Sequence, residues 1–120
     1  MELKDMLRCA AQPVHPKKYG PNLVFGLPCI RPDGTAVLIG DTINGETHTY
    51  EVKPETISRP TGIRRKDGFV YEHDSYANPK GDVVTVFWSD DHACWKYGYN
   101  GTSVTAMLCD MPDDFEKVRR

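Results

Sequence analysis

The sequence predicts a small, mainly β protein: a strand-rich α+β chain with small antiparallel sheets or a partly open β-barrel. Two observations carry this prediction. The chain has 120 residues and 39% hydrophobic content, which suits one compact domain with its own core. After Asn22, short runs rich in β-branched and aromatic residues alternate with turn dipeptides such as Asn-Gly and Asp-Gly.

The first half of the chain predicts a short helix followed by three strands. Residues 1–11 place apolar side chains at helical spacing, and Pro13 follows that segment as a stop. Residues 23–27 and 35–39 read as strands on either side of an Asp-Gly turn, so we expect them to pair as a hairpin. Residues 47–52 form the next expected strand, behind an Asn-Gly turn.

The second half predicts a sheet built around residues 83–88, whose two faces are both mostly apolar, as in a central strand. Residues 94–99 return as its hairpin partner with alternating aromatic side chains. Residues 69–71 and 102–108 are further expected strands. The last residues, from 112 to 120, fit a short helix capped by Asp110, with acidic residues first and basic residues last.

The chain is expected to be one domain, 1–120, with lobes at 22–53 and 61–110 and a proline-containing connector at 54–60. No segment has the uninterrupted apolar stretch of a signal peptide or a membrane span, which predicts a cytoplasmic protein with no membrane partner. Its four cysteines should then stay reduced. The net charge of −2 lacks the basic excess of a nonspecific nucleic-acid binder.

Several motifs follow one another in the order seen in a known family. They are YEVKPETI at 50–57, PTGI at 60–63 and KDGFVYEHD at 66–74, flanked by NLVFG at 22–26 and VVTVFWSD at 83–90. This order resembles the YopX family of phage and prophage proteins. The matching signature positions are Pro54, Glu55, Thr56, Thr61, Gly62, Asp67, Gly68, Tyr71, Glu72, Asp74 and Trp88.

The resemblance implies a phage or prophage origin and a β-rich fold. It supplies no catalytic residue, because the family has no established activity to transfer. The chain departs from the family at His73, where the family has glycine, at Ser75 and Tyr76, where it has an aliphatic pair, and in its C-terminal tail.

No motif indicates an enzyme, a cofactor or a metal. His92, Cys94 and Cys109 are of zinc-ligand type, but no C-x-x-C pair accompanies them, and unpaired cysteines usually act as small buried apolar residues. Glu72 and Asp74 have the spacing of a carboxylate pair, for which a solvated strand end is the simpler interpretation. We therefore expect no catalytic, cofactor-binding or metal site.

One dense basic group, Arg64, Arg65 and Lys66, lies near aromatic residues and resembles a small phosphate-contacting surface. The leading hypothesis is a cytoplasmic phage accessory protein that acts through protein contacts, with itself as a homo-oligomer or with another phage or host protein. The alternative is a small β-barrel that binds nucleic acid through these three residues.

Overall fold

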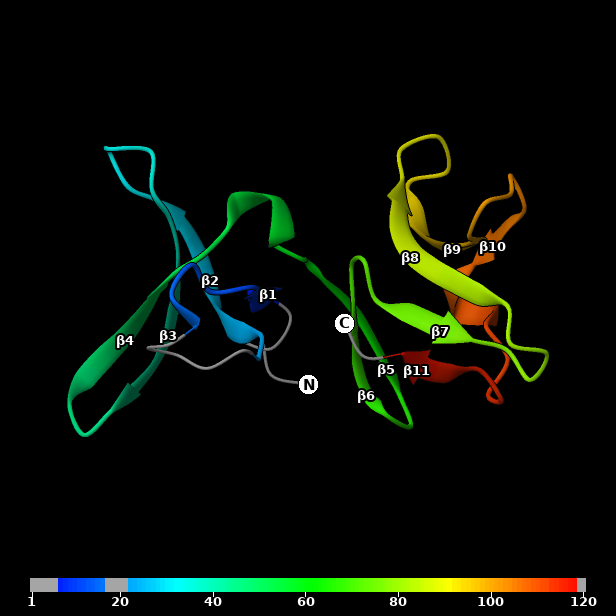
Figure 1. The fold of residues 1–120 in the computed structure, drawn as a ribbon, viewed down its shortest axis with the longest axis horizontal. Coiled ribbons are helices and arrows are strands. Elements are labelled where there is room, and N and C mark those ends of the chain that lie inside the picture. Colours follow the sequence, from blue (N-terminus) through cyan, green and yellow to red (C-terminus); the bar gives the residue numbers. More distant parts are fainter. Residues whose placement is uncertain (1–6, 17–21, 119–120) are drawn as a thin grey trace. The chain divides into compact units, whose positions relative to one another are not determined.

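The computed structural model describes residues 7–16 and 22–118, with only the backbone described at 41–43 (Figure 1). The chain divides into two compact units, Met1–Pro60 and Thr61–Arg120. Both are built from antiparallel strands, which confirms the predicted mainly β class with small antiparallel sheets. No closed barrel occurs within these residues.

The first unit is a four-stranded sheet in the order β1–β2–β3–β4. Its strands are β1 (Cys9–Ala11), β2 (Val24–Ile30), β3 (Ala36–Ile43) and β4 (Glu46–Glu51). The expected hairpin of β2 and β3 is confirmed, with Leu27 opposite Ile39. Asn44 and Gly45, with φ of 54° and 81°, form the tight turn between β3 and β4, where only residues tolerant of positive φ fit well.

One face of this sheet carries the core of the first unit. The buried side chains are Cys9, Ala11, Val24, Ala36, Leu38 and Val52, with Tyr50 and Ile57 packed against them. The 3₁₀ turn η1 (Pro54–Thr56) follows, and Ser58 then exchanges two backbone hydrogen bonds with Ala10, at 3.0 and 2.7 Å.

The predicted N-terminal helix is corrected in part. Residues 1–6 lie outside the described residues and Leu7 is helical, but Cys9–Ala11 is the strand β1. The reason is tertiary: Ala10 lies between β2 and Ser58 and bonds to both, and Ala10 and Ala11 are almost fully buried. Helical spacing alone does not reveal such pairing.

The second unit is a five-stranded sheet in the order β10–β9–β8–β7–β11, with a separate hairpin of β5 and β6. Its strands are β5 (Pro60–Arg65), β6 (Gly68–Tyr71), β7 (Ser75–Ala77), β8 (Val83–Ser89), β9 (Cys94–Tyr99), β10 (Thr105–Met107) and β11 (Glu116–Val118), and η2 (Leu108–Asp110) follows β10. The predictions that β8 is central and pairs with β9 are both confirmed.

The core of the second unit gathers around β8 and the segment that follows η2. Its buried members are Val70, Tyr76, Val84, Val86, Tyr97, Leu108, Met111 and Phe115. Trp88 and Trp95 are cross-strand neighbours and meet edge to face at 5.2 Å. The aromatic alternation of this hairpin therefore serves packing between strands.

The predicted C-terminal helix is wrong. Residues 112–114 form a turn and an irregular step, and Glu116–Val118 pairs with β7 as the edge strand β11. A helix of this length is too short to be stable alone, even with acidic residues first and basic residues last. The strand is favoured instead because Phe115 is buried in the core and β11 pairs with the edge of β7. Among the described residues, no helix has the length and apolar content needed to cross a membrane.

Candidate functional site

The predicted basic group does not form one free surface, because Arg65 is committed to its own unit. Its guanidinium donates from Nη1 to the carbonyl oxygen of Met111 at 3.1 Å, and from Nη2 to those of Pro112 and Phe115 at 2.8 and 3.3 Å. The same group lies over the ring of Tyr76, 5.2 Å from its centre. Arg65 thus fastens the segment before β11 to the β5–β6 hairpin.

Lys66 and Arg64 point to other partners. The Lys66 ammonium donates to Glu116 at 2.8 Å, and this hydrogen bond raises the pKa of Lys66. Arg64 is exposed and stacks over Phe69 at 5.4 Å. All three basic residues line a hollow of about 460 Å³ that also contains the carboxyl group of Asp113. Of the three basic side chains, only Lys66 is paired with a carboxylate, that of Glu116.

Tyr76, beneath Arg65, is fully buried, and its hydroxyl lacks a hydrogen-bond partner among the described residues. Burial is the main cause that raises its pKa above the ordinary value near 10, followed by the charge of Asp74. An unsatisfied buried hydroxyl lowers stability, since it gives up its bonds to water without replacement.

We expect Tyr76→Phe to raise the free energy of unfolding by about 1 kcal/mol at neutral pH. A raised folded-state pKa gives stability that is complete below about pH 10 and is lost as pH rises beyond it. The variant should therefore lose less stability than the wild type between pH 9 and 11. Some loss should remain because burial also raises the pKa of Tyr97. Urea titrations across this range measure both effects, and unchanged or lower stability at pH 7 would contradict the expectation.

The E-x-D pair, Glu72 and Asp74, lies between β6 and β7, and its aspartate has a structural role. Asp74 is 2% exposed, accepts a hydrogen bond from the backbone N–H of Tyr71 at 2.8 Å and pairs with the ammonium of Lys117 at 3.2 Å. The backbone N–H of Lys117 also donates to the carboxylate of Asp67 at 3.0 Å. These contacts hold β11 against β7 and the β5–β6 turn.

His73, between Glu72 and Asp74, has φ of 71°, in the left-handed region. This is the position at which the resembled family carries glycine, the residue that adopts such a backbone without strain. We expect His73→Gly to raise the melting temperature, with a gain of roughly 0.5–1 kcal/mol in stability. A differential scanning calorimetry trace with an unchanged or lower midpoint would count against this reading of the backbone.

Other signature positions also serve the scaffold. Thr61 donates to the carbonyl of Val70 at 2.8 Å, and Thr56, at the end of η1, accepts the backbone N–H of Gln12 at 2.9 Å. The remaining members lie in η1, in strands or at turns: Pro54, Glu55, Gly62, Gly68, Tyr71, Glu72 and Trp88. The signature therefore describes how the two units are built.

The residues of zinc-ligand type are not gathered into a site. His92 bonds to Ser89 in the β8–β9 turn at 3.3 Å, Cys94 faces the sulfur of Met107, and Cys109 lies beside Asp110. The part of the chain that the structure describes holds no group of three or more His, Cys, Asp or Glu side chains suited to a metal ion.

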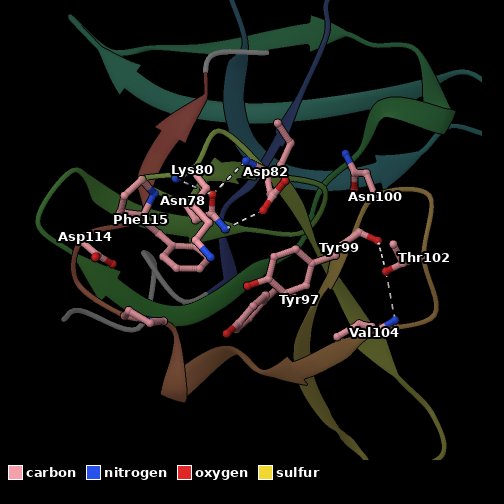
Figure 2. A pocket seen from close by; sticks show the side chains of 13 residues that line it. Asn78, Lys80, Asp82, Tyr97, Tyr99, Asn100, Thr102, Val104, Asp114 and Phe115 are labelled. Carbon is pink, nitrogen blue, oxygen red and sulfur yellow. Dashed lines mark hydrogen bonds between the residues drawn. The ribbon is translucent and has the colours of Figure 1, made fainter.

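A larger groove, of about 810 Å³, opens on the second unit (Figure 2). Sequence reasoning did not predict it, because it joins the end of β9 to three separate loops. Its lining combines aromatic, aliphatic and charged side chains: Asn78, Pro79, Lys80, Asp82, Val83, Tyr97, Tyr99, Asn100, Thr102, Val104, Pro112, Asp114 and Phe115. The only sequence signal was the aromatic alternation of residues 94–99.

The loops around the groove are held in shape by local hydrogen bonds. Asn78 accepts the backbone N–H groups of Lys80 and Asp82 at 3.0 and 2.9 Å, and donates to the Asp82 carboxylate at 3.2 Å. On the opposite side, the Thr102 hydroxyl donates to the carbonyl of Tyr99 and accepts the backbone N–H of Val104 (Figure 2). Both rims are therefore fixed turns.

Aromatic rings form the floor of the groove. Tyr97 meets Tyr99 and Phe115 edge to face, at 6.2 and 5.9 Å between ring centres. Lys80, Asp82 and Asp114 place one positive and two negative charges along its lining. The lining therefore offers hydrogen-bonding groups and apolar contact.

Part of the sheet in the first unit carries exposed apolar side chains on the face opposite the core. Phe25, Leu27 and Ile39 lie on the side of the sheet opposite the core and are 38%, 46% and 39% exposed. Leu27 and Ile39 are direct cross-strand neighbours. Among the described residues β4 is the last strand of this sheet, and the N–H of Val14 donates to the carbonyl of Glu51 at its end, at 2.9 Å.

Comparisons with protein-family models, curated proteins and solved structures found no match to this chain.

Proposed function

We propose that this chain is a phage or prophage accessory protein of the YopX type that acts through protein contacts, with copies of itself or with another phage or host protein, in the cytoplasm. The ordered YopX-like signature supports the origin. His73 has a left-handed backbone, and the resembled family has glycine at this position. This agreement adds support, because glycine is the residue that adopts such a backbone without strain.

The observation that carries the proposed mode of action is the groove of the second unit. Its volume of about 810 Å³ lies within the range of binding sites, and its open form suits an extended peptide segment better than an enclosed small molecule. Aromatic floor residues give apolar contact, while Lys80, Asn100 and Asp114 offer donors and acceptors for a peptide backbone. Such mixed chemistry is typical of protein recognition.

The second candidate function is nucleic-acid binding through Arg64, Arg65 and Lys66. The observation that favours it is the exposed Arg64 stacked on Phe69 at the edge of a hollow. Against it, Arg65 already donates to three carbonyl groups and Lys66 is paired with Glu116. A phosphate backbone would have to compete with these contacts, which leaves one uncommitted cation, too few for strong salt-dependent binding.

Light scattering on the purified chain tests the self-association part of the proposal. We expect a discrete particle at a multiple of the 13.6 kDa chain mass, unchanged by Arg64→Ala. A 13.6 kDa monomer at every concentration up to about 1 mM would overturn self-association. A mass that changes with Arg64→Ala would instead place the contact at the basic hollow.

A further inference from the structure

We propose that the groove of the second unit binds a proline-rich segment of another protein, held in polyproline II conformation, with a basic side chain of that segment beside Asp114. The inference rests on the proposed function and names the chemical class of the partner. Every lining residue of the groove belongs to the second unit, Thr61–Arg120.

The first rim of the groove, residues 78–82, uses its own backbone N–H groups. Those of Lys80 and Asp82 donate to the side-chain oxygen of Asn78, at 3.0 and 2.9 Å. The N–H of Gly81 donates to the carbonyl of Asn78, and the N–H of Asn78 to the carbonyl of Asp82, both at 2.9 Å. The fifth residue is proline, which has no N–H, so this rim offers a partner no backbone donor.

The opposite rim is similar. The N–H groups of Tyr99 and Asn100 donate to the carbonyls of Val104 and Val83, both at 3.0 Å. Those of Thr102 and Val104 donate to the Tyr99 carbonyl and the Thr102 hydroxyl, both at 3.1 Å. Adding a strand to a sheet needs a row of unpaired N–H and C=O groups along one edge. Because both rims use most of their N–H groups internally, side chains must recognise the partner.

A segment in polyproline II conformation meets this requirement. It has no internal backbone hydrogen bonds and its backbone remains hydrated, so it needs no ladder of partner groups. Proline-rich segments of this kind bind in grooves lined by aromatic side chains, because their conformation exists before binding and little entropy is lost. The aromatic floor of the groove therefore suits such a segment.

The groove supplies apolar surface of two kinds. Tyr97 and Phe115 are each 5% exposed, so they form a firm floor. More accessible apolar side chains also line the groove: Pro79, Tyr99, Val104 and Pro112. Every third residue of a polyproline II segment lies on the same edge, so prolines at that spacing can all face this surface.

Charge complementarity indicates a basic residue in the partner. The lining contains the carboxylates of Asp82 and Asp114 but only one ammonium group, that of Lys80. The Asp82 carboxylate already accepts a hydrogen bond from Asn78 at 3.2 Å, whereas Asp114 is exposed. Figure 2 shows Asp114 at one end of the lining and Asn100 at the other. A lysine or arginine at one end of the bound segment therefore lies beside Asp114.

The chain's own proline-containing segment is not the occupant. Its single P-x-x-P sequence runs from Pro13 to Pro16. Pro13 is buried and bridges to Val52, and the N–H of Val14 donates to the carbonyl of Glu51 at 2.9 Å. Binding in the groove would break these contacts of the first unit, so we assign the segment to another protein.

Fluorescence anisotropy with labelled synthetic peptides tests the inference. The probe is a twelve-residue peptide with proline at every third position and two arginines at one end. One comparison peptide has alanine in place of each proline, and the other has glutamate in place of each arginine. We expect saturable binding of the probe and about tenfold weaker binding of both comparison peptides. No binding of the probe, or equal binding of the glutamate peptide, would overturn the inference.

The variant Asp114→Asn tests the position of the basic residue. We expect it to bind the probe about threefold to fivefold more weakly, because an exposed ion pair contributes modestly. Asp113→Asn is the matched control: it removes the same charge one position earlier, but Asp113 lines the smaller hollow, so the affinity should not change. Equal weakening in the two variants would indicate an effect of net charge alone and overturn the role of Asp114.

The outcomes separate this inference from the proposed function. Equal binding of the proline and alanine peptides would refute polyproline recognition and leave the groove as a site of protein contact. A discrete oligomer in light scattering that binds none of the peptides would also refute the inference but leave self-association in place. A 13.6 kDa monomer that binds none of them would refute both.

Discussion

Replacing Arg65 with Ala is expected to lower the free energy of unfolding of the second unit by about 3 kcal/mol. The change removes the donors of three hydrogen bonds, to Met111, Pro112 and Phe115, and the contact with the Tyr76 ring. The carbonyl groups of a half-buried segment then lose their partners, which costs more than the bonds themselves contribute.

Urea unfolding followed by tryptophan fluorescence measures this effect, since both tryptophans, Trp88 and Trp95, belong to the second unit. Arg64→Ala is the matched control. This variant also removes one positive charge, but the only contact it removes is the exposed stacking of Arg64 on Phe69. Its free energy of unfolding should therefore fall by less than about 1 kcal/mol. Equal losses in the two variants would show that Arg65 is no more structural than Arg64.

The second large effect is expected for Gly26→Ala in β2. A Cβ atom at this position would lie 2.5 Å from the carbonyl oxygen of Ile39 and 3.0 Å from the nitrogen of Gly40. Both are backbone atoms of the neighbouring strand, so β2 and β3 must separate to admit it. We expect a loss of about 3 kcal/mol, at the upper end for overpacked sites, or failure to fold.

Far-UV circular dichroism during thermal unfolding measures the change, because both units are built from strands. Gly98→Ala in β9 is the control: its Cβ would meet a Phe87 ring carbon at 3.4 Å, a side chain that can move. Its melting temperature should stay close to that of the wild type. Equal melting temperatures for the Gly26→Ala and Gly98→Ala chains would contradict the close approach of β2 and β3.

The strands with the strongest local signals were predictable. The β8–β9 hairpin has apolar content on both faces and turn residues at Asp90 and Asp91, and β2 and β3 flank an Asp-Gly turn. Local preference and tertiary pairing agree at these places. The sequence was also right that β8 lies at the centre of its sheet.

The short strands β6 and β10 were predicted, whereas β5, β7 and β11 were not, for different reasons. β5 begins with Pro60, and proline in the sequence indicated an irregular stretch. At the first residue of a strand, however, the absence of a backbone N–H costs little stability. β7 and β11 have three residues each, too few for a periodic signal. Their pairing depends on Phe115 and Lys117, which contact residues 40 or more positions earlier.

The same limit applies to the candidate sites. The run of Arg64, Arg65 and Lys66 was visible as charge, but the sequence could not show that Arg65 turns inward to carbonyl groups 46 to 50 positions later. The groove likewise joins residues from 78 to 115. Charge runs reveal which groups are present, whereas their partners follow from the tertiary fold.

The central claim, that this chain works through protein contacts and not through nucleic acid, is tested most directly by one titration. Fluorescence anisotropy would follow a labelled 20-nucleotide single strand, and its duplex, as wild-type protein is added at 20 and 150 mM salt. We predict no saturable binding at 150 mM salt, because two of the three basic side chains already have partners. Tight binding with a steep salt dependence that disappears in an Arg64→Ala/Lys66→Ala chain would contradict the account.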